Sequence, residues 1–137
     1  MQPGKKRYKY LISYVLSAFK ETFGGEIVLI LKQISIEHMG YFKIQYKYLP
    51  LQYDIVFENE RDRFVIDIFD EEGARNSLFR ITKFNNELAV ENIYESIVKL
   101  KKVLEEGNMC FYIQQNEKLY RKFQGEYKRV KNLYKLR

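Results

Sequence analysis

The residues best suited to chemistry in this sequence are eight carboxylates within residues 53–72, a stretch that carries only two basic residues. Clustered carboxylates can hold a divalent cation, because hard ions prefer several oxygen ligands, and such an ion can activate water for hydrolysis. The eight residues are Asp54, Glu58, Glu60, Asp62, Asp67, Asp70, Glu71 and Glu72. One function consistent with these carboxylates is therefore that of a metal-dependent hydrolase.

The spacing of these carboxylates does not match a known metal site. One common nuclease pattern pairs an Asp on one strand with a carboxylate-x-Lys triplet on the next, yet no lysine occurs from Gln52 to Thr82. That lysine would stabilise charge at the phosphate. The segment from Asp67 to Gly73 also lacks the alternating ligands of a calcium loop. We predict no metal site and no cofactor, and metal-dependent hydrolysis stays the third alternative.

Other catalytic sets are equally hard to find. The chain has one histidine, His38, and one cysteine, Cys110, so the usual zinc sets and an internal disulfide are excluded. No glycine-rich phosphate loop and no G-x-S-x-G motif occurs. We predict no catalytic residues. Cys110 lies in an apolar run and is expected in the core, and a lone thiol suits a reducing, cytoplasmic compartment.

Charge is sorted along the chain beneath a net charge of +6. Residues 1–52 contain eight basic and three acidic residues, and residues 118–137 contain eight basic residues and one acidic residue. The acidic stretch thus lies between two basic ends. Because surface fields steer partners, this sorting says more about binding than about folding.

The acidic stretch predicts a docking face for a basic protein partner. A hairpin tip followed by an acidic turn would present negative potential, which gives fast and salt-sensitive association. The alternative is that these carboxylates only keep a strand edge soluble. The predicted partner-binding residues are Glu58, Glu60, Asp62, Asp67, Asp70, Glu71 and Glu72.

The basic C-terminal segment predicts a different partner, nucleic acid. Lysine and arginine alternate with tyrosine there, and nucleic-acid surfaces use cations on phosphates and rings on bases. Basic residues on edge strands also discourage aggregation, which is the simpler explanation. The residues of this alternative site are Arg121, Lys122, Lys128 and Arg129.

Apolar spacing predicts two long helices. The first runs from about Lys6 to Thr22 and ends at Gly24-Gly25, since glycine adopts the left-handed conformation cheaply. Its basic start and its apolar run mimic a secretion signal, but the helical spacing favours an amphipathic helix. The second helix carries an apolar stripe from Val90 to Leu104 and stops at Gly107. No stretch is long enough to span a bilayer.

Alternating apolar and polar residues predict the strands. The run from Arg63 to Asp70 is apolar on both faces, so we expect it near the middle of the sheet with a helix over part of its second face. A four-residue connection, Asn59 to Asp62, precedes it. The predicted strands are Ile27–Ile36, Phe42–Tyr48, Tyr53–Glu58, Arg63–Asp70, Met109–Gln114 and Leu119–Phe123.

The order of elements predicts an α+β fold, a mainly antiparallel sheet of five to seven strands with two long helices packed on it. The order is helix, four strands, helix, then two or three strands. At 137 residues the chain fits a single domain, 1–137. Residues 125–137 could form a last strand, a short helix or a flexible basic tail.

The segment Tyr53–Glu60 together with Phe64–Gly73, following an amphipathic first helix, resembles the small cytoplasmic immunity proteins of bacterial toxin systems. The resemblance implies a short α+β chain without catalytic residues, whose acidic face blocks a basic, nuclease-like toxin. It assigns no role to an individual residue. The leading hypothesis is therefore a non-catalytic immunity or inhibitor protein that covers the active site of a toxin, with nucleic-acid binding as the alternative.

Overall fold

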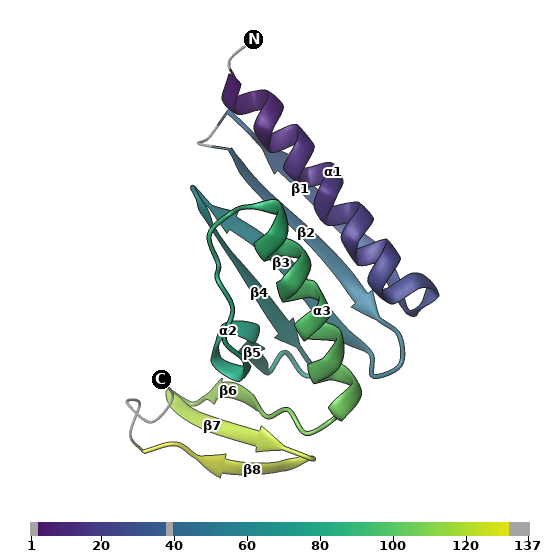
Figure 1. The fold of residues 1–137 in the computed structure, drawn as a ribbon. Helices are drawn as coiled ribbons and strands as arrows, with labels where there is room; N and C mark the ends of the chain where they lie inside the picture. The colour runs from purple at the N-terminus through teal and green to yellow at the C-terminus, as the bar shows by residue number, and fades with distance from the viewer. Residues whose placement is uncertain (1–2, 38–39, 132–137) are drawn as a thin grey trace.

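An eight-stranded antiparallel sheet forms the base of the computed structural model, which describes residues 3–37 and 40–131 (Figure 1). Each strand pairs with the next in chain order, so the sheet is a continuous meander. The strands are β1 (Ile27–Ser35), β2 (Tyr41–Tyr48), β3 (Tyr53–Glu60), β4 (Arg63–Phe69), β5 (Arg75–Ser77), β6 (Phe111–Gln115), β7 (Lys118–Phe123) and β8 (Glu126–Arg129). The α+β class and the antiparallel sheet are confirmed.

Both predicted long helices are present, and they lie on the same face of the sheet (Figure 1). These are α1 (Pro3–Phe23) and α3 (Val90–Glu106), and α3 ends at Gly107 in the left-handed conformation, as predicted. A short 3₁₀ turn, η1 (Gly24–Glu26), follows α1, and a four-residue helix, α2 (Leu78–Ile81), follows β5. In the described part of the chain, no helix is long and apolar enough to cross a membrane.

The predicted number of strands was too low, whereas the two long helices are confirmed, and the short helix that the sequence indicates around Ala74 to Ile81 corresponds to α2. The sheet has eight strands instead of five to seven, and α2 adds a third α-helix. β5 was missed because its three residues, Arg-Asn-Ser, have no β propensity of their own and owe their strand conformation to pairing with β4. The start of the supposed tail is β8, while residues 132–137 and His38 lie outside the described residues.

Two hairpin turns are tighter than the sequence predicted. β3 and β4 are joined by Arg61 and Asp62 alone, and β6 and β7 by Asn116 and Glu117. Arg61, Asn116 and Glu117 have positive φ angles of 55°, 52° and 64°. Positive φ at the centre of a two-residue turn matches the twist of the flanking strands, so pairing extends further than the residue types suggest.

The core lies between the sheet and the two long helices and is dominated by aromatic rings. Phe19 of α1, Phe42 of β2, Phe57 of β3 and Phe64 of β4 are all at most 1% exposed. Phe57 stacks between Phe42 and Phe64, with ring centroids 5.9 and 5.0 Å apart. The alternation read in β2 and β4 therefore correctly assigns the faces that pack against the helices.

The opposite face of the sheet, here called the open face, is not covered by α1 or α3 (Figure 1). Its side chains pair across strands, for example Lys47 with Asp54, whose Nζ and Oδ1 atoms are 2.6 Å apart. β4 is central, as expected, but Val65 on its second face is 39% exposed, so the helix expected over that face is not found at this position. Any functional site on β2–β4 therefore has access to solvent here.

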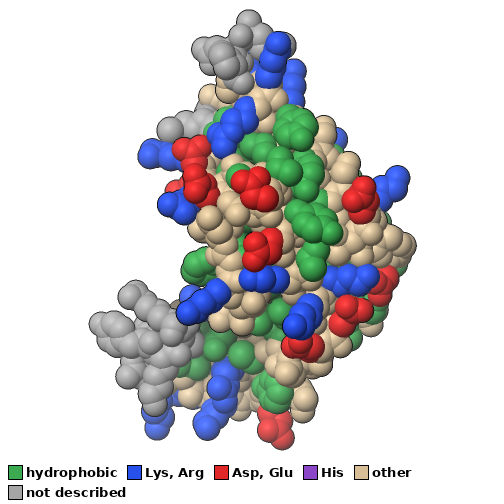
Figure 2. Space-filling view, viewed as in Figure 1, with side chains coloured by type: hydrophobic (Ala, Val, Ile, Leu, Met, Phe, Trp, Pro, Cys, Tyr) green, Lys and Arg blue, Asp and Glu red, His purple; other side chains and the backbone are tan. Residues whose placement is uncertain are grey.

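Some apolar side chains also reach the surface on the helix side. Figure 2 shows a hydrophobic stripe between the two long helices, and the exposed Tyr10, Tyr94 and Val98 belong to α1 and α3. Tyr14 lies half-buried beside them, and burial raises its pKa. The exposed apolar side chains of both long helices therefore form one stripe on this side of the molecule.

Candidate partner-binding site

The structure divides the seven predicted acidic residues among three places. Glu60 and Asp62 lie at the tip of the β3–β4 hairpin, while Glu58 and Asp67 lie along its strands on the open face. The remaining three, residues 70–72, form the turn that follows β4 at the other end. Because β4 has seven residues, these two ends are about 20 Å apart. The seven carboxylates therefore do not form one compact face.

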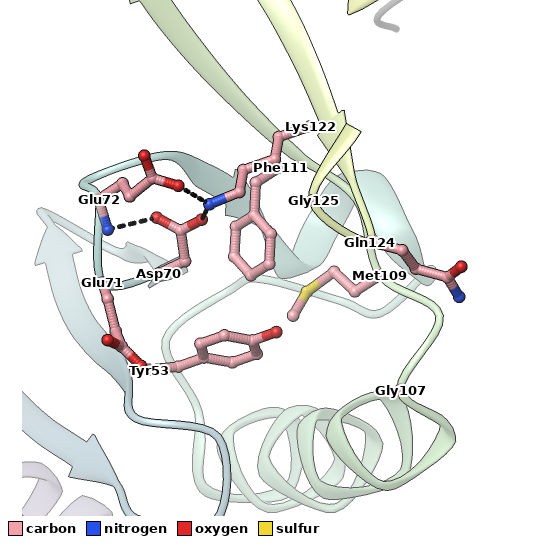
Figure 3. Close-up of a pocket in the computed structure, with 10 residues that line it drawn as sticks. All are labelled: Tyr53, Asp70, Glu71, Glu72, Gly107, Met109, Phe111, Lys122, Gln124 and Gly125. Atoms are coloured by element: carbon pink, nitrogen blue, oxygen red, sulfur yellow. Dashed lines mark hydrogen bonds and ion pairs between the residues drawn. The ribbon is translucent and has the colours of Figure 1, made fainter. Parts of the chain in front are cut away.

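The turn after β4 is tied to β7 by Lys122 (Figure 3). The Lys122 Nζ atom lies 2.8 Å from Asp70 Oδ2 and also bonds to Glu72, whose carboxylate accepts a further bond of 2.7 Å from Tyr127 Oη. Asp70 and Glu72 raise the pKa of Lys122, and Lys122 and Tyr127 lower the pKa of Glu72. The single charge of Lys122 balances one of the two carboxylates, so the group keeps a net charge of −1, and its bonds tie the turn after β4 to β7.

A cavity of about 310 Å³ opens beside this turn, next to Gly107 at the end of α3 (Figure 3). Its apolar wall includes Tyr53 and Phe111, which meet edge to face at 5.0 Å, and Met109. The exposed Glu71 side chain is turned away from Lys122. Asp70 and Glu72 already bind Lys122, and the accessible carboxylates of this cavity are Glu71 and Glu72, since the Glu72 side chain is still 54% exposed.

The hairpin-tip carboxylate Asp62 is also engaged within the chain. Its Oδ1 atom lies 3.3 Å from Arg7 Nη1, and Arg7 Nη2 donates to the carbonyl of Leu88 at 2.9 Å. Both charged side chains are well exposed, so the pair contributes little stability. It nevertheless brings a basic residue of α1 to the acidic tip and reduces the local negative potential.

Glu58 and Asp67 are diagonal neighbours on the open face. Glu58 accepts a hydrogen bond of 2.5 Å from Tyr41 Oη, and this bond, with burial, raises the pKa of Tyr41 to about 12. Burial raises the pKa of Asp67, Arg75 opposes this shift, and the charge of Glu58 adds to it. Two carboxylates that are close together and partly buried favour a cation between them.

A groove of about 420 Å³ adjoins Glu58 at the tip end of the open face. Glu58 and Glu60 supply its carboxylates, while Tyr41 and Val65 supply apolar walls. Arg63 also lines it, but its Nη1 atom donates to Asn86 Oδ1 at 3.3 Å. Between residues 3–37 and 40–131, no ion pair engages Glu58 or Glu60. This Glu58–Glu60 groove can accept a long cationic side chain, stem against the walls and charge against the carboxylates.

Asn59 supports the groove from the core side of β3, a role that was not predicted from the sequence. Its side chain is fully buried, and Oδ1 accepts from Phe42 N at 2.6 Å while Nδ2 donates to Gly40 O at 2.9 Å. The signal was available, because Asn59 continues the inward-facing series of Ile55 and Phe57. A polar residue at a core position needs fixed partners, and these partners anchor β3 to the start of β2.

The four residues of the predicted nucleic-acid site separate onto two faces of the β7–β8 hairpin. Arg121 is paired directly with Lys128, whereas Lys122 is paired with Tyr127 and Arg129 with Tyr120. Directly opposed residues share a face, and successive residues alternate. Arg121 and Lys128 therefore lie on one face, and Lys122 and Arg129 lie on the other.

Further basic residues join Arg121 and Lys128. Register pairs run from Arg75 to Tyr112, then to Arg121 and Lys128, which places all four side chains on the open face. Arg80 lines a cavity of about 320 Å³ with Arg75, Tyr112 and Asp67. We name Arg75, Arg80, Tyr112, Arg121 and Lys128 the basic cluster. It combines cations with one aromatic ring, the pairing used to bind nucleic acids.

The described residues include no group of three or more His, Cys, Asp and Glu side chains that could hold a metal ion. Cys110 was expected in the core but is only half-buried, with its Sγ atom 3.8 Å from Tyr112 Oη. It lies just before β6, at the end of the sheet that the long helices leave uncovered (Figure 1). Comparison with protein-family models, curated proteins and solved structures found no match for this chain.

Proposed function

We propose that this chain is a non-catalytic binding protein that inhibits a basic protein partner, as the immunity proteins it resembles do. The Glu58–Glu60 groove is the observation that carries the proposal. It places two carboxylates of the predicted acidic set beside apolar walls on a solvent-accessible face. A lysine or arginine side chain of the partner would fill the groove.

The groove is suited to such a side chain before the partner arrives. Tyr41 already holds Glu58 by a hydrogen bond, and β3 is anchored through the buried Asn59. Preorganised groups lose less conformational entropy on binding, so more of the interaction energy appears as affinity. A nuclease-like toxin needs cations to bind phosphate. Covering one of them would block its substrate, and the association would weaken as salt concentration rises.

The test uses the gene next to the one for this chain, which we expect to encode a toxin with a basic C-terminal domain. Isothermal titration of that domain should give tight binding to the wild-type chain. The double variant Glu58→Gln with Glu60→Lys should weaken binding about 100-fold, because two charge-assisted hydrogen bonds are lost. The matched control is Glu105→Gln with Glu106→Lys, which makes the same change in net charge at two exposed carboxylates at the end of α3.

The same titration can reject the groove. If the double variant binds the toxin domain as tightly as wild type while Glu71→Lys does not, the partner docks at the turn after β4. Undiminished growth rescue by the double variant in cells that express the toxin would argue against the groove independently.

Nucleic-acid binding is the second candidate function, and the basic cluster is the observation that favours it. Arg75, Arg121 and Lys128 follow one register line across the four strands β5 to β8, with Tyr112 between Arg75 and Arg121. Cations spaced along a line suit a phosphate backbone, and an aromatic ring among them can stack on a base. The cluster and the Glu58–Glu60 groove occupy different parts of the open face.

Fluorescence anisotropy with labelled single-stranded RNA and DNA tests this candidate. The double variant Arg121→Gln with Lys128→Gln should bind about tenfold more weakly and lower the slope of log affinity against log salt by about 2. The control, Lys118→Gln with Arg129→Gln, removes the same charge from the other face of the hairpin. Equal losses in both variants would show that only total charge matters and would remove the basic cluster as a site.

A further inference from the structure

Among residues 3–37 and 40–131, no strand pairs with the outer side of β1, so β1 is a free edge of the sheet, and apolar side chains lie on both of its faces. Val28, Leu29, Ile30 and Leu31 are consecutive, and each is 41–50% exposed. The other edge, β8, carries Glu126, Lys128 and Arg129, which is how natural sheets discourage pairing. β1 carries a single charge, Lys32. A long apolar edge of this kind is a template for an added strand.

The hydrogen bonds of β2 show which backbone groups of β1 face the free edge. Glu26 O accepts from Leu49 N at 2.8 Å, so the carbonyl of Glu26 points to β2, and the N–H of Ile27, on the opposite side of the same trans peptide, points away from β2. Successive residues of an antiparallel strand direct their N–H and C=O groups to opposite sides. The backbone groups of Ile27 and Leu29 therefore point away from β2.

A β-bulge between Leu29 and Leu31 inserts one extra residue, so beyond it the alternation of backbone directions is shifted by one position. Beyond it, Phe42 N bonds to the Asn59 side chain on the β3 side, so the partner of Phe42 in β1, Ile34, directs its own groups to the free edge. Alternation gives the same direction to Lys32. The positions open to a new strand are thus 27, 29, 32 and 34, with steps of two, three and two residues.

We propose that β1 pairs antiparallel with β1 of a second copy of this chain, about a two-fold axis between Ile30 and Leu31. In an antiparallel copy of β1 the order of these steps is reversed. Because the order two, three, two is the same in both directions, the open positions of the two copies can face each other along the whole strand. In this register alone, the three-residue step of one β1 lies opposite the three-residue step of the other β1. Any other register opposes steps of unequal length and breaks the ladder, so the bulge selects one alignment.

Side-chain pairing in this register is also compatible with a dimer. Directly opposed residues share a face, so Ile27 lies against Ile34 of the second copy, and Ile30 lies against its Leu31. Lys32 lies against Leu29 of the second copy and away from the other lysine, so no like charges meet. The proposal concerns β1 alone and is independent of the groove and of the basic cluster.

Two variants of Leu29 test the dimer and its register together. We expect sedimentation equilibrium to show a concentration-dependent dimer for wild type. Leu29→Lys places two like-charge pairs against Lys32 and should weaken the dimer about tenfold, whereas Leu29→Glu forms two opposite-charge pairs and should bind at least as tightly as wild type. The variants are equally polar, so each controls for the other, and circular dichroism checks that both fold.

Three results would overturn the proposal. A wild-type chain that stays monomeric up to millimolar concentration has no self-pairing edge, even if β1 accepts a strand of another protein. Equal dissociation of both Leu29 variants excludes this register. In a Cys110→Ala background, Val28→Cys with Gln33→Cys should form a disulfide between copies because these positions face each other, while Val28→Cys alone should not. Equal cross-linking of both would contradict the alignment.

Discussion

Phe57→Ala is expected to lower the free energy of unfolding by about 4 kcal/mol, the largest effect of any single change considered for this chain. Phe57 is fully buried and stacks with Phe42 and Phe64, and it meets Phe19 of α1 edge to face at 6.4 Å. Removing the ring loses its transfer free energy, leaves a cavity and ends three aromatic contacts. Urea unfolding followed by circular dichroism measures the change.

The control for this prediction is Phe79→Ala. Phe79 is 52% exposed, so its removal should cost about 1 kcal/mol or less. A loss below about 2 kcal/mol for Phe57→Ala would mean that the core collapses into the space or that β3 packs differently from the structure. Comparable losses for both variants would contradict the assignment of Phe57 to the centre of the core.

Asn59→Ala should cost about 3 kcal/mol, although it removes only a small polar side chain. The substitution leaves Phe42 N and Gly40 O without their partner in a buried site, and each unsatisfied group carries a desolvation penalty. We expect a thermal midpoint about 10 °C below wild type. Scanning calorimetry measures this shift. The binding assay for the Glu58–Glu60 groove, run on the same variant, measures the effect on partner affinity.

Asn108→Ala is the matched control, because Asn108 is exposed in the loop after α3 and should change the midpoint by only a degree or two. If Asn59→Ala left the midpoint unchanged, the amide would not anchor β3 to β2. A stable Asn59→Ala variant that still lost partner binding would separate the two roles and show that Asn59 only positions the groove.

The acidic and basic segments of the sequence do not form separate acidic and basic regions on the surface of the folded chain. Lys122, from the basic C-terminal segment, pairs with Asp70 and Glu72 and offsets half of their charge, and Arg7, from the basic N-terminal segment, pairs with Asp62. Segments of opposite charge attract one another when the chain brings them together. The charged groups that stay available to a partner are two carboxylates in a groove at one end of the open face and the basic cluster toward the other end.

Patterns of local origin could be read from the sequence. Alternation assigned the buried faces of β2 and β4, and a stripe repeating at helical spacing located α3 and its stop at Gly107. These features depend on neighbours within a few residues, because side-chain direction repeats every two residues in a strand and every 3.6 in a helix. The acidic hairpin was found for the same reason.

Features that join distant segments were decided by the tertiary structure alone. β5 is a strand because β4 and β6 pair with it, Lys122 bridges a turn fifty residues away, and the Glu58–Glu60 groove needs Tyr41 from another strand. The exposure of β1 follows from its place at the edge of the sheet, since the same apolar run in a central strand would be buried. Residue types determine which faces avoid water, whereas contacts between distant segments determine which groups meet, and binding sites are made of the groups that meet.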